Sequence, residues 1–111
     1  MKALFHINEP DRWPRVLLNI NNFIKDVGPG GTSIVVVANG TGVLAYSQGK
    51  KELIRQMEDL HGQGVVFAAC RNALNMNNIR EDSLPPFITV VPAGITEIVK
   101  RQGEGYAYIK P

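Results

Sequence analysis

Two hydrophobic patterns alternate along this chain. Short, mostly apolar runs, typical of strands covered on both faces, alternate with segments whose apolar residues recur at every third or fourth position, as on one face of a helix. The runs predict strands at 3–7, 33–38, 65–69, 87–91 and 106–109. The segments between them predict helices at 10–27, 50–61, 71–78 and 95–102.

The first and last helices have the clearest signals. Pro10 suits the first turn of a helix, and Asn8 or Glu9 is available as its cap. A turn at 92–94 precedes the last helix. The apolar residues of that helix, which we expect to face inward, are Ile95, Ile98 and Val99.

The segment 43–46 has two interpretations. Asn39-Gly40 is a common hairpin signal, so the segment could be the return arm of a hairpin. It could equally be a short helix or loop between two parallel strands, and we favour this second interpretation.

Strands that alternate with helices form βαβ units. With 111 residues, the chain has the length of one domain, which we expect to span 1–111. The sequence therefore predicts a single α/β domain. Its architecture is a three-layer α/β/α sandwich with a mostly parallel sheet of about five strands.

Charge and composition exclude several classes of protein. The net charge is only +2, and the Lys and Arg residues are scattered rather than gathered in the basic stripe that nucleic acids require. No run reaches the roughly 20 apolar residues that span a bilayer, and the first residues lack the apolar core of a signal peptide. A single cysteine cannot form an internal disulfide, which fits a reducing compartment. We expect a cytoplasmic protein without membrane or nucleic-acid partners.

Polar and flexible residues follow each predicted strand. Because the carboxyl ends of parallel strands share one edge of the sheet, which is where open α/β sheets bind ligands, we expect these residues to lie together. They are Asn8, Asn39, Gly40, Thr41, Cys70, Arg71, Asn72 and Gly94. Amides, a thiol and backbone N–H groups suit a small anion or a polarised sulfur group. Paired carboxylates for acid–base catalysis are missing, as are nucleotide-binding motifs, so no cofactor is expected.

Cys70 is the strongest candidate in this set. At the junction between a strand and a helix, the free N–H groups of the helix favour a thiolate, and Arg71 could assist if its side chain folded back over the site. A buried, inert cysteine is the alternative interpretation.

The two histidines, His6 in the first strand and His61 at a helix end, do not have metal-ligand spacing with Cys70, and no metal site is expected. A catalytic Cys–His pair stays open, since its members need only be neighbours in the fold. Tyr46, Tyr106 and Tyr108 are expected to pack in the core or at a subunit interface.

Three segments are similar to a known family. The segment 65–74 (V-V-F-A-A-C-R-N-A-L), the ending with P-A-G and R-Q-x-x-G-Y-A-Y, and V-V-A-N-G at 36–40 resemble the DsrE/DsrF-like sulfur-relay family. This resemblance implies an α/β/α sandwich that assembles into trimers or hexamers. It also implies that a cysteine at the position of Cys70 carries sulfur as a persulfide between donor and acceptor proteins. The characterised systems use several different subunits, which a single chain does not show.

The leading hypothesis is therefore a sulfur carrier with sulfurtransferase-like activity, in which Cys70 accepts sulfane sulfur as a persulfide. N–H groups of the following helix and of the loop 39–42 would stabilise it. The alternative is a homo-oligomeric binding module that holds a small anion without catalysis. A thiol hydrolase would need a base, and His6 or His61 would have to reach Cys70.

Overall fold

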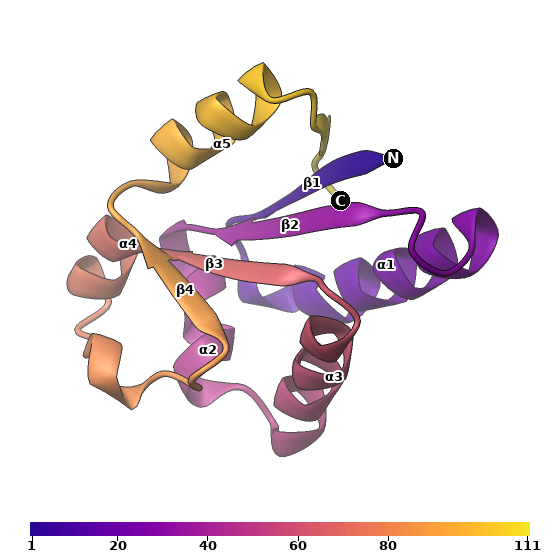
Figure 1. Ribbon diagram of the computed structural model, residues 1–111. Helices are drawn as coiled ribbons and strands as arrows, with labels where there is room; N and C mark the ends of the chain where they lie inside the picture. The colour runs from indigo at the N-terminus through magenta and orange to yellow at the C-terminus, as the bar shows by residue number, and fades with distance from the viewer.

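The computed structural model describes residues 1–111 as a parallel sheet between two layers of helices (Figure 1). The five strands lie in the order β4-β3-β2-β1-β5, and every neighbouring pair is parallel. The strands are β1 (Lys2–Ile7), β2 (Ser33–Ala38), β3 (Val66–Cys70), β4 (Ile88–Val91) and β5 (Ala107–Ile109). This confirms the predicted α/β/α class, with a sheet that is wholly parallel.

The helices and 3-10 turns fill the connections between these strands. The helices are α1 (Trp13–Val27), α2 (Leu44–Gln48), α3 (Lys51–Gly62), α4 (Arg71–Met76) and α5 (Gly94–Gly103). The 3-10 turns are η1 (Pro10–Arg12), η2 (Gly40–Val43) and η3 (Glu81–Ser83). No helix combines the length and the apolar character needed to cross a bilayer.

The segment after β2 is helical, as favoured, and forms no hairpin. Strand β2 already has β1 on one side and β3 on the other, so an antiparallel return arm has no free edge to pair with. The chain instead turns at Gly40, whose φ of 52° suits glycine, into η2 and α2. Gly42 lies so close to β1 that an added Cβ would be 2.6 Å from the Ile7 carbonyl oxygen.

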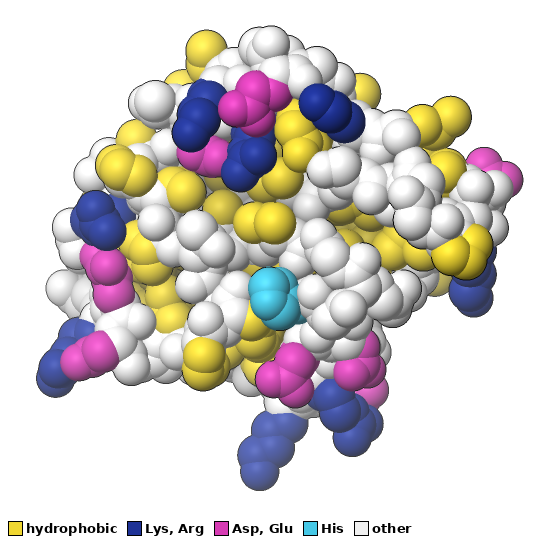
Figure 2. Space-filling model, viewed as in Figure 1, with side chains coloured by type: hydrophobic (Ala, Val, Ile, Leu, Met, Phe, Trp, Pro, Cys, Tyr) yellow, Lys and Arg dark blue, Asp and Glu magenta, His cyan; other side chains and the backbone are white.

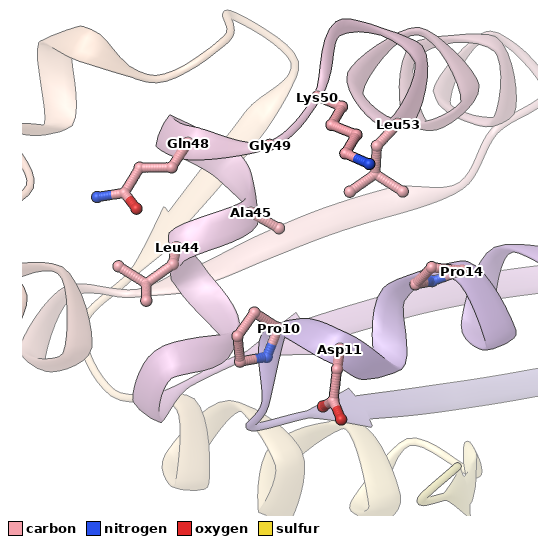
Figure 3. Close-up of a pocket in the computed structure, with 9 residues that line it drawn as sticks. All are labelled: Pro10, Asp11, Pro14, Leu44, Ala45, Gln48, Gly49, Lys50 and Leu53. Carbon is pink, nitrogen blue, oxygen red and sulfur yellow. The ribbon is translucent and has the colours of Figure 1, made fainter.

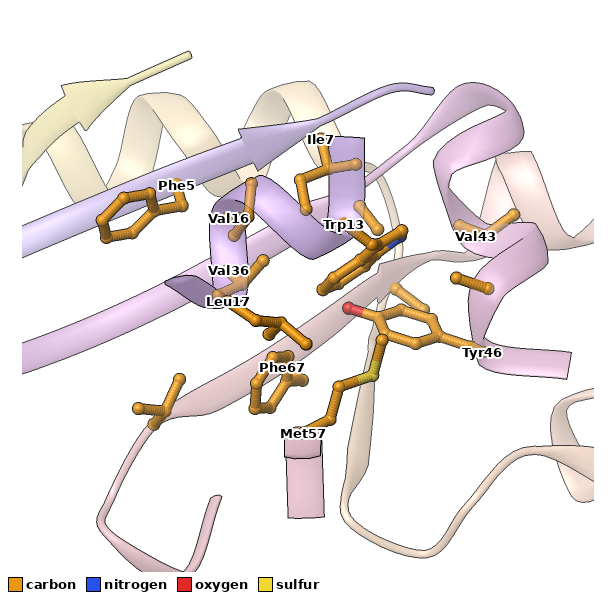
Figure 4. Close-up of a cluster of buried hydrophobic side chains, with 14 of the residues drawn as sticks. Phe5, Ile7, Trp13, Val16, Leu17, Val36, Val43, Tyr46, Met57 and Phe67 are labelled. Carbon is orange, nitrogen blue, oxygen red and sulfur yellow. The ribbon is translucent and has the colours of Figure 1, made fainter. Parts of the chain in front are cut away.

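The main core lies between the sheet and helices α1, α2 and α3 (Figure 4). The Trp13 ring packs against Tyr46 and Phe67, with centroid distances of 5.2 and 6.2 Å. Its Nε1 donates a hydrogen bond to the Gly42 carbonyl at 2.9 Å, and Tyr46 Oη donates to the Ala68 carbonyl at 3.1 Å. Burial raises the pKa of Tyr46 well above its ordinary value, because desolvation penalises the phenolate.

The opposite face of the sheet is covered by α5 (Figure 1). Its smaller core contains Ile98, packed with apolar residues of the strands. Ile95 and Val99, predicted to face inward, are 61% and 64% exposed, so that expectation was wrong for both. A single helix over a sheet face buries only one stripe of its residues, and these two lie outside that stripe.

Candidate functional site

A pocket of about 440 Å³ opens at the carboxyl edge of β2 and β3. Its wall is built from the turn after β2, the last residue of β3, helix α4 and the start of α5. The lining residues are Asn39, Gly40, Thr41, Cys70, Asn72, Ala73, Met76, Asn77, Ala93, Gly94 and Ile95. None of these residues carries a charged side chain.

Six residues that the sequence analysis selected line this pocket together. They are Asn39, Gly40, Thr41, Cys70, Asn72 and Gly94. Their meeting follows from the parallel sheet, because β2 and β3 are neighbours in register and both end at this edge. The other two selected residues, Asn8 and Arg71, do not line the pocket.

Asn8 lies outside the pocket and contacts Thr41 of its wall. Its carbonyl oxygen accepts a hydrogen bond from Thr41 Oγ1 at 3.3 Å, and its Oδ1 accepts one from Lys110 Nζ at 3.0 Å. Arg71 points toward η3, where its Nε lies 2.7 Å from Glu81 Oε2. The hydrogen bond to Glu81, together with the charge of that carboxylate, raises the pKa of Arg71. The guanidinium is thus drawn toward Glu81 and does not fold over Cys70.

Cys70 is the last residue of β3, one position later than predicted, and the residue is buried, with 7% exposure. Helix α5 begins directly beside it. A Cβ added at Gly94 would lie 3.2 Å from Cys70 Cβ and 3.1 Å from Asn39 Cβ, tighter than ordinary contacts. Glycine therefore allows the positive end of the α5 dipole to approach the thiol closely.

Neither histidine lines the pocket. His61 Nδ1 lies 3.0 Å from the carbonyl oxygen of Val65, next to the start of β3, whereas Cys70 is at the other end of that strand. His6 contacts the pocket indirectly, because its Nε2 is 2.8 Å from Asn39 Oδ1. A thiol hydrolase with a histidine base on Cys70 has no support in this arrangement.

Sequence reasoning missed five residues of the wall: Ala73, Met76, Asn77, Ala93 and Ile95. Asn77 Nδ2 donates hydrogen bonds to the carbonyls of Ala73 at 2.8 Å and Gly40 at 3.2 Å, which joins α4 to the turn after β2. The only sequence feature that could have indicated the role of Asn77 is its position four residues after Ala73, at the end of a short helix. Met76 is 84% exposed and stands at the rim.

A second pocket, of about 390 Å³, lies on the opposite side of the sheet between η1, α2 and the start of α3 (Figure 3). Asp11 and Lys50 are its charged residues, and Leu44 and Leu53 form part of its apolar wall. It is lined by no cysteine, serine, threonine or tyrosine. On the molecular face of Figure 2, acidic and basic side chains are interspersed with exposed apolar ones, and no basic stripe is visible.

Comparison with known proteins agrees with this fold. The model of the DsrE/DsrF-like family matches residues 2–111. The solved structure of a protein of unknown function, MTH1491 from Methanobacterium thermoautotrophicum, superposes with a TM-score of 0.89 and is 35% identical in sequence. The match covers 99% of this chain and 98% of that chain. No curated protein matches the sequence.

Proposed function

This chain belongs to the DsrE/DsrF-like family, and we propose that its Cys70 accepts a sulfane sulfur as a persulfide and passes it on. The family is associated with sulfur relay. The observation that carries the proposal is the position of Cys70, the only cysteine of the chain. It lies in the wall of an uncharged pocket at the carboxyl edge of the sheet, beside the starts of α4 and α5.

The transfer is an exchange of one sulfur atom between two thiols. The Cys70 thiolate attacks the outer sulfur of a donor persulfide, a bond forms between the two sulfurs, and the donor S–S bond breaks. The donor leaves as a thiolate and Cys70 holds the persulfide, so no external oxidant or reductant is needed. The thiolate of an acceptor protein then attacks the outer sulfur of the Cys70 persulfide, and Cys70 leaves as a thiolate.

The pocket has the groups that such a reaction requires. Amides of Asn39 and Asn72 and N–H groups at the start of α5 can donate hydrogen bonds to negatively charged sulfur. No carboxylate in the wall opposes that charge. Apolar side chains, among them Met76, suit a large and polarisable sulfur atom.

The test is sulfur uptake measured on the intact protein. After incubation with glutathione persulfide, we expect the mass of the wild-type chain to increase by one sulfur atom and that of Cys70→Ser to stay unchanged. The variant is nearly isosteric, so its thermal midpoint should match that of the wild type. An unmodified wild-type mass, or equal uptake by Cys70→Ser, would refute the proposal.

A binding module is the second candidate function. It is favoured by the same uncharged, donor-rich wall, which suits a small anion without any chemistry at Cys70. In this case sulfite or phosphate should raise the thermal midpoint of the wild type and of Cys70→Ser equally. If the protein is a persulfide carrier, the Cys70→Ser variant instead takes up no sulfur.

We further propose that the protein is a homo-oligomer, a trimer or hexamer as the family resemblance implies. DsrE-like proteins often form oligomers. In this chain, Val99 on α5 and Tyr108 on the edge strand β5 are exposed apolar residues on the thinly covered side of the sheet, and Ile109 is exposed on the same edge strand.

Substitution of Val99 tests this surface. Because a buried lysine lacks a partner at an apolar interface, Val99→Lys should shift the assembly toward the monomer, as measured by light scattering after size-exclusion chromatography. Leu18→Lys is the matched control: Leu18 lies on α1 and is 60% exposed, against 64% for Val99. Equal masses for the two variants would contradict the assignment of the α5 face.

A further inference from the structure

A buried histidine, His6, contacts Asn39 in the wall of the Cys70 pocket. His6 is only 7% exposed, on a sheet whose buried side chains are otherwise apolar. Side chains alternate along β1, and Phe5 and Ile7 belong to the main core, so His6 faces α5 on the same side as Leu4. A polar ring in this position needs hydrogen-bond partners, and both of its nitrogens have one.

The contact with Asn39 indicates which nitrogen carries the proton. Asn39 Oδ1, 2.8 Å from His6 Nε2, can only accept a hydrogen bond, so Nε2 must donate. In the neutral ring Nδ1 is then an acceptor, and the hydroxyl of Tyr108, at 2.5 Å, donates to it. Tyr108, on the edge strand β5, is thus the second hydrogen-bond partner of this histidine.

This tautomer is consistent with the orientation of the Asn39 amide. Its oxygen is held by His6, and none of the side-chain hydrogen bonds within the protein uses its Nδ2. Asn39 shares the pocket wall with Cys70, and the Cβ atoms of both lie close to Gly94. With the other tautomer, Nε2 would accept from the amide nitrogen, and the amide oxygen would turn toward the pocket and repel an anionic sulfur.

We propose that His6 is a positioning residue which, held by Tyr108, orients the Asn39 amide so that its N–H groups face the sulfur of Cys70. The inference rests on the proposed function and deepens it, because it names the donor that recognises the thiolate or persulfide. His6 itself exchanges no proton with the sulfur. It acts through Asn39.

The first test measures the alkylation rate of Cys70 by iodoacetamide near neutral pH. His6→Leu fills the volume but removes the donor, and the loss of a hydrogen bond to a charged sulfur should slow alkylation about tenfold. His6→Gln keeps an N–H at the same place and should restore most of the rate. The control is Tyr106→Phe, which removes the 2.7 Å hydrogen bond between Ser33 and Tyr106 at the same sheet edge without contacting His6.

A double-mutant cycle shows whether His6 acts through Asn39. In an Asn39→Ala background, His6→Leu should have no further effect on the alkylation rate. A merely structural role would slow alkylation by the same factor in both backgrounds. That outcome, or a wild-type rate in His6→Leu, overturns the proposal.

The tautomer can also be read in the wild-type protein, so the test does not depend on a variant that folds. Nitrogen-15 NMR of the neutral His6 ring should show the proton on Nε2, and a proton on Nδ1 overturns the proposal. Neither alkylation nor NMR requires sulfane sulfur, so a failure of sulfur uptake would refute the proposed function alone.

Discussion

Gly94→Val is expected to slow both the alkylation of Cys70 and its uptake of sulfur by about a hundredfold, since displacing a site by about 1 Å can have this effect. Even the first added carbon would lie 3.1 and 3.2 Å from the Cβ atoms of Asn39 and Cys70. The same added carbon would also lie 3.5 Å from Val37 Cγ1. The isopropyl group must therefore cover the thiol or push the start of α5 away from the sheet edge.

A graded series separates this effect from a general weakening of α5. Gly94→Ala requires its neighbours to move by only a few tenths of an ångström, so its rates should fall between those of the wild type and Gly94→Val. The matched control is Gly103→Val at the other end of the same helix, where an added Cβ meets nothing within 4 Å. Rates are measured by intact mass, and folding by circular dichroism. A Gly94→Val variant that reacts at the wild-type rate contradicts the role of this contact.

The sheet and the edge that carries the pocket could be predicted because they depend on local patterns. The unbroken run Ile34-Val35-Val36-Val37 is β-branched and has no polar alternation, which is typical of a strand covered on both faces. Once the strands are parallel, the residues that follow β2 and β3 must share an edge. Asn39 and Cys70 meet for this reason alone.

Which side chains form hydrogen bonds or ion pairs with one another could not be predicted from such local patterns. Arg71 is the first residue of α4, but its partner Glu81 belongs to the connection before β4, which has no periodicity to place it. His6 joins Asn39 and Tyr108 because β1 lies between β2 and β5, and this strand order is not encoded in any short segment. Contacts of this kind depend on the completed topology.

The apolar stripe of the last helix shows a second limit of prediction from the sequence. Ile95 and Val99 have the spacing of core residues, yet they are exposed, because one face of α5 suffices to cover its side of the sheet. Periodicity identifies residues that avoid water, but it does not distinguish a core within one chain from an interface between copies. The Val99→Lys experiment addresses that distinction.

The largest effect on stability is expected for Trp13→Ala. Trp13 is fully buried, and truncation of a buried tryptophan lowers the free energy of unfolding by about 3–5 kcal/mol. The Gly42 carbonyl would also lose its hydrogen bond from Trp13 Nε1, and an unpaired buried carbonyl costs about 1–3 kcal/mol more unless the turn relaxes. Because small domains have a total stability of roughly 5–15 kcal/mol, the variant should be close to unfolding at room temperature.

Urea denaturation followed by circular dichroism measures this loss, since Trp13 is the only tryptophan and its fluorescence is absent from the variant. Trp13→Phe separates the two contributions: it keeps most of the apolar volume but not the donor, so its loss reflects mainly the Gly42 hydrogen bond. Leu18→Ala, on the exposed side of the same helix, should change stability by about 0.5 kcal/mol or less. If Trp13→Ala were no more destabilising than Leu18→Ala, this core would not hold η2 against the sheet. The turn that carries Asn39 into the pocket would then need another support.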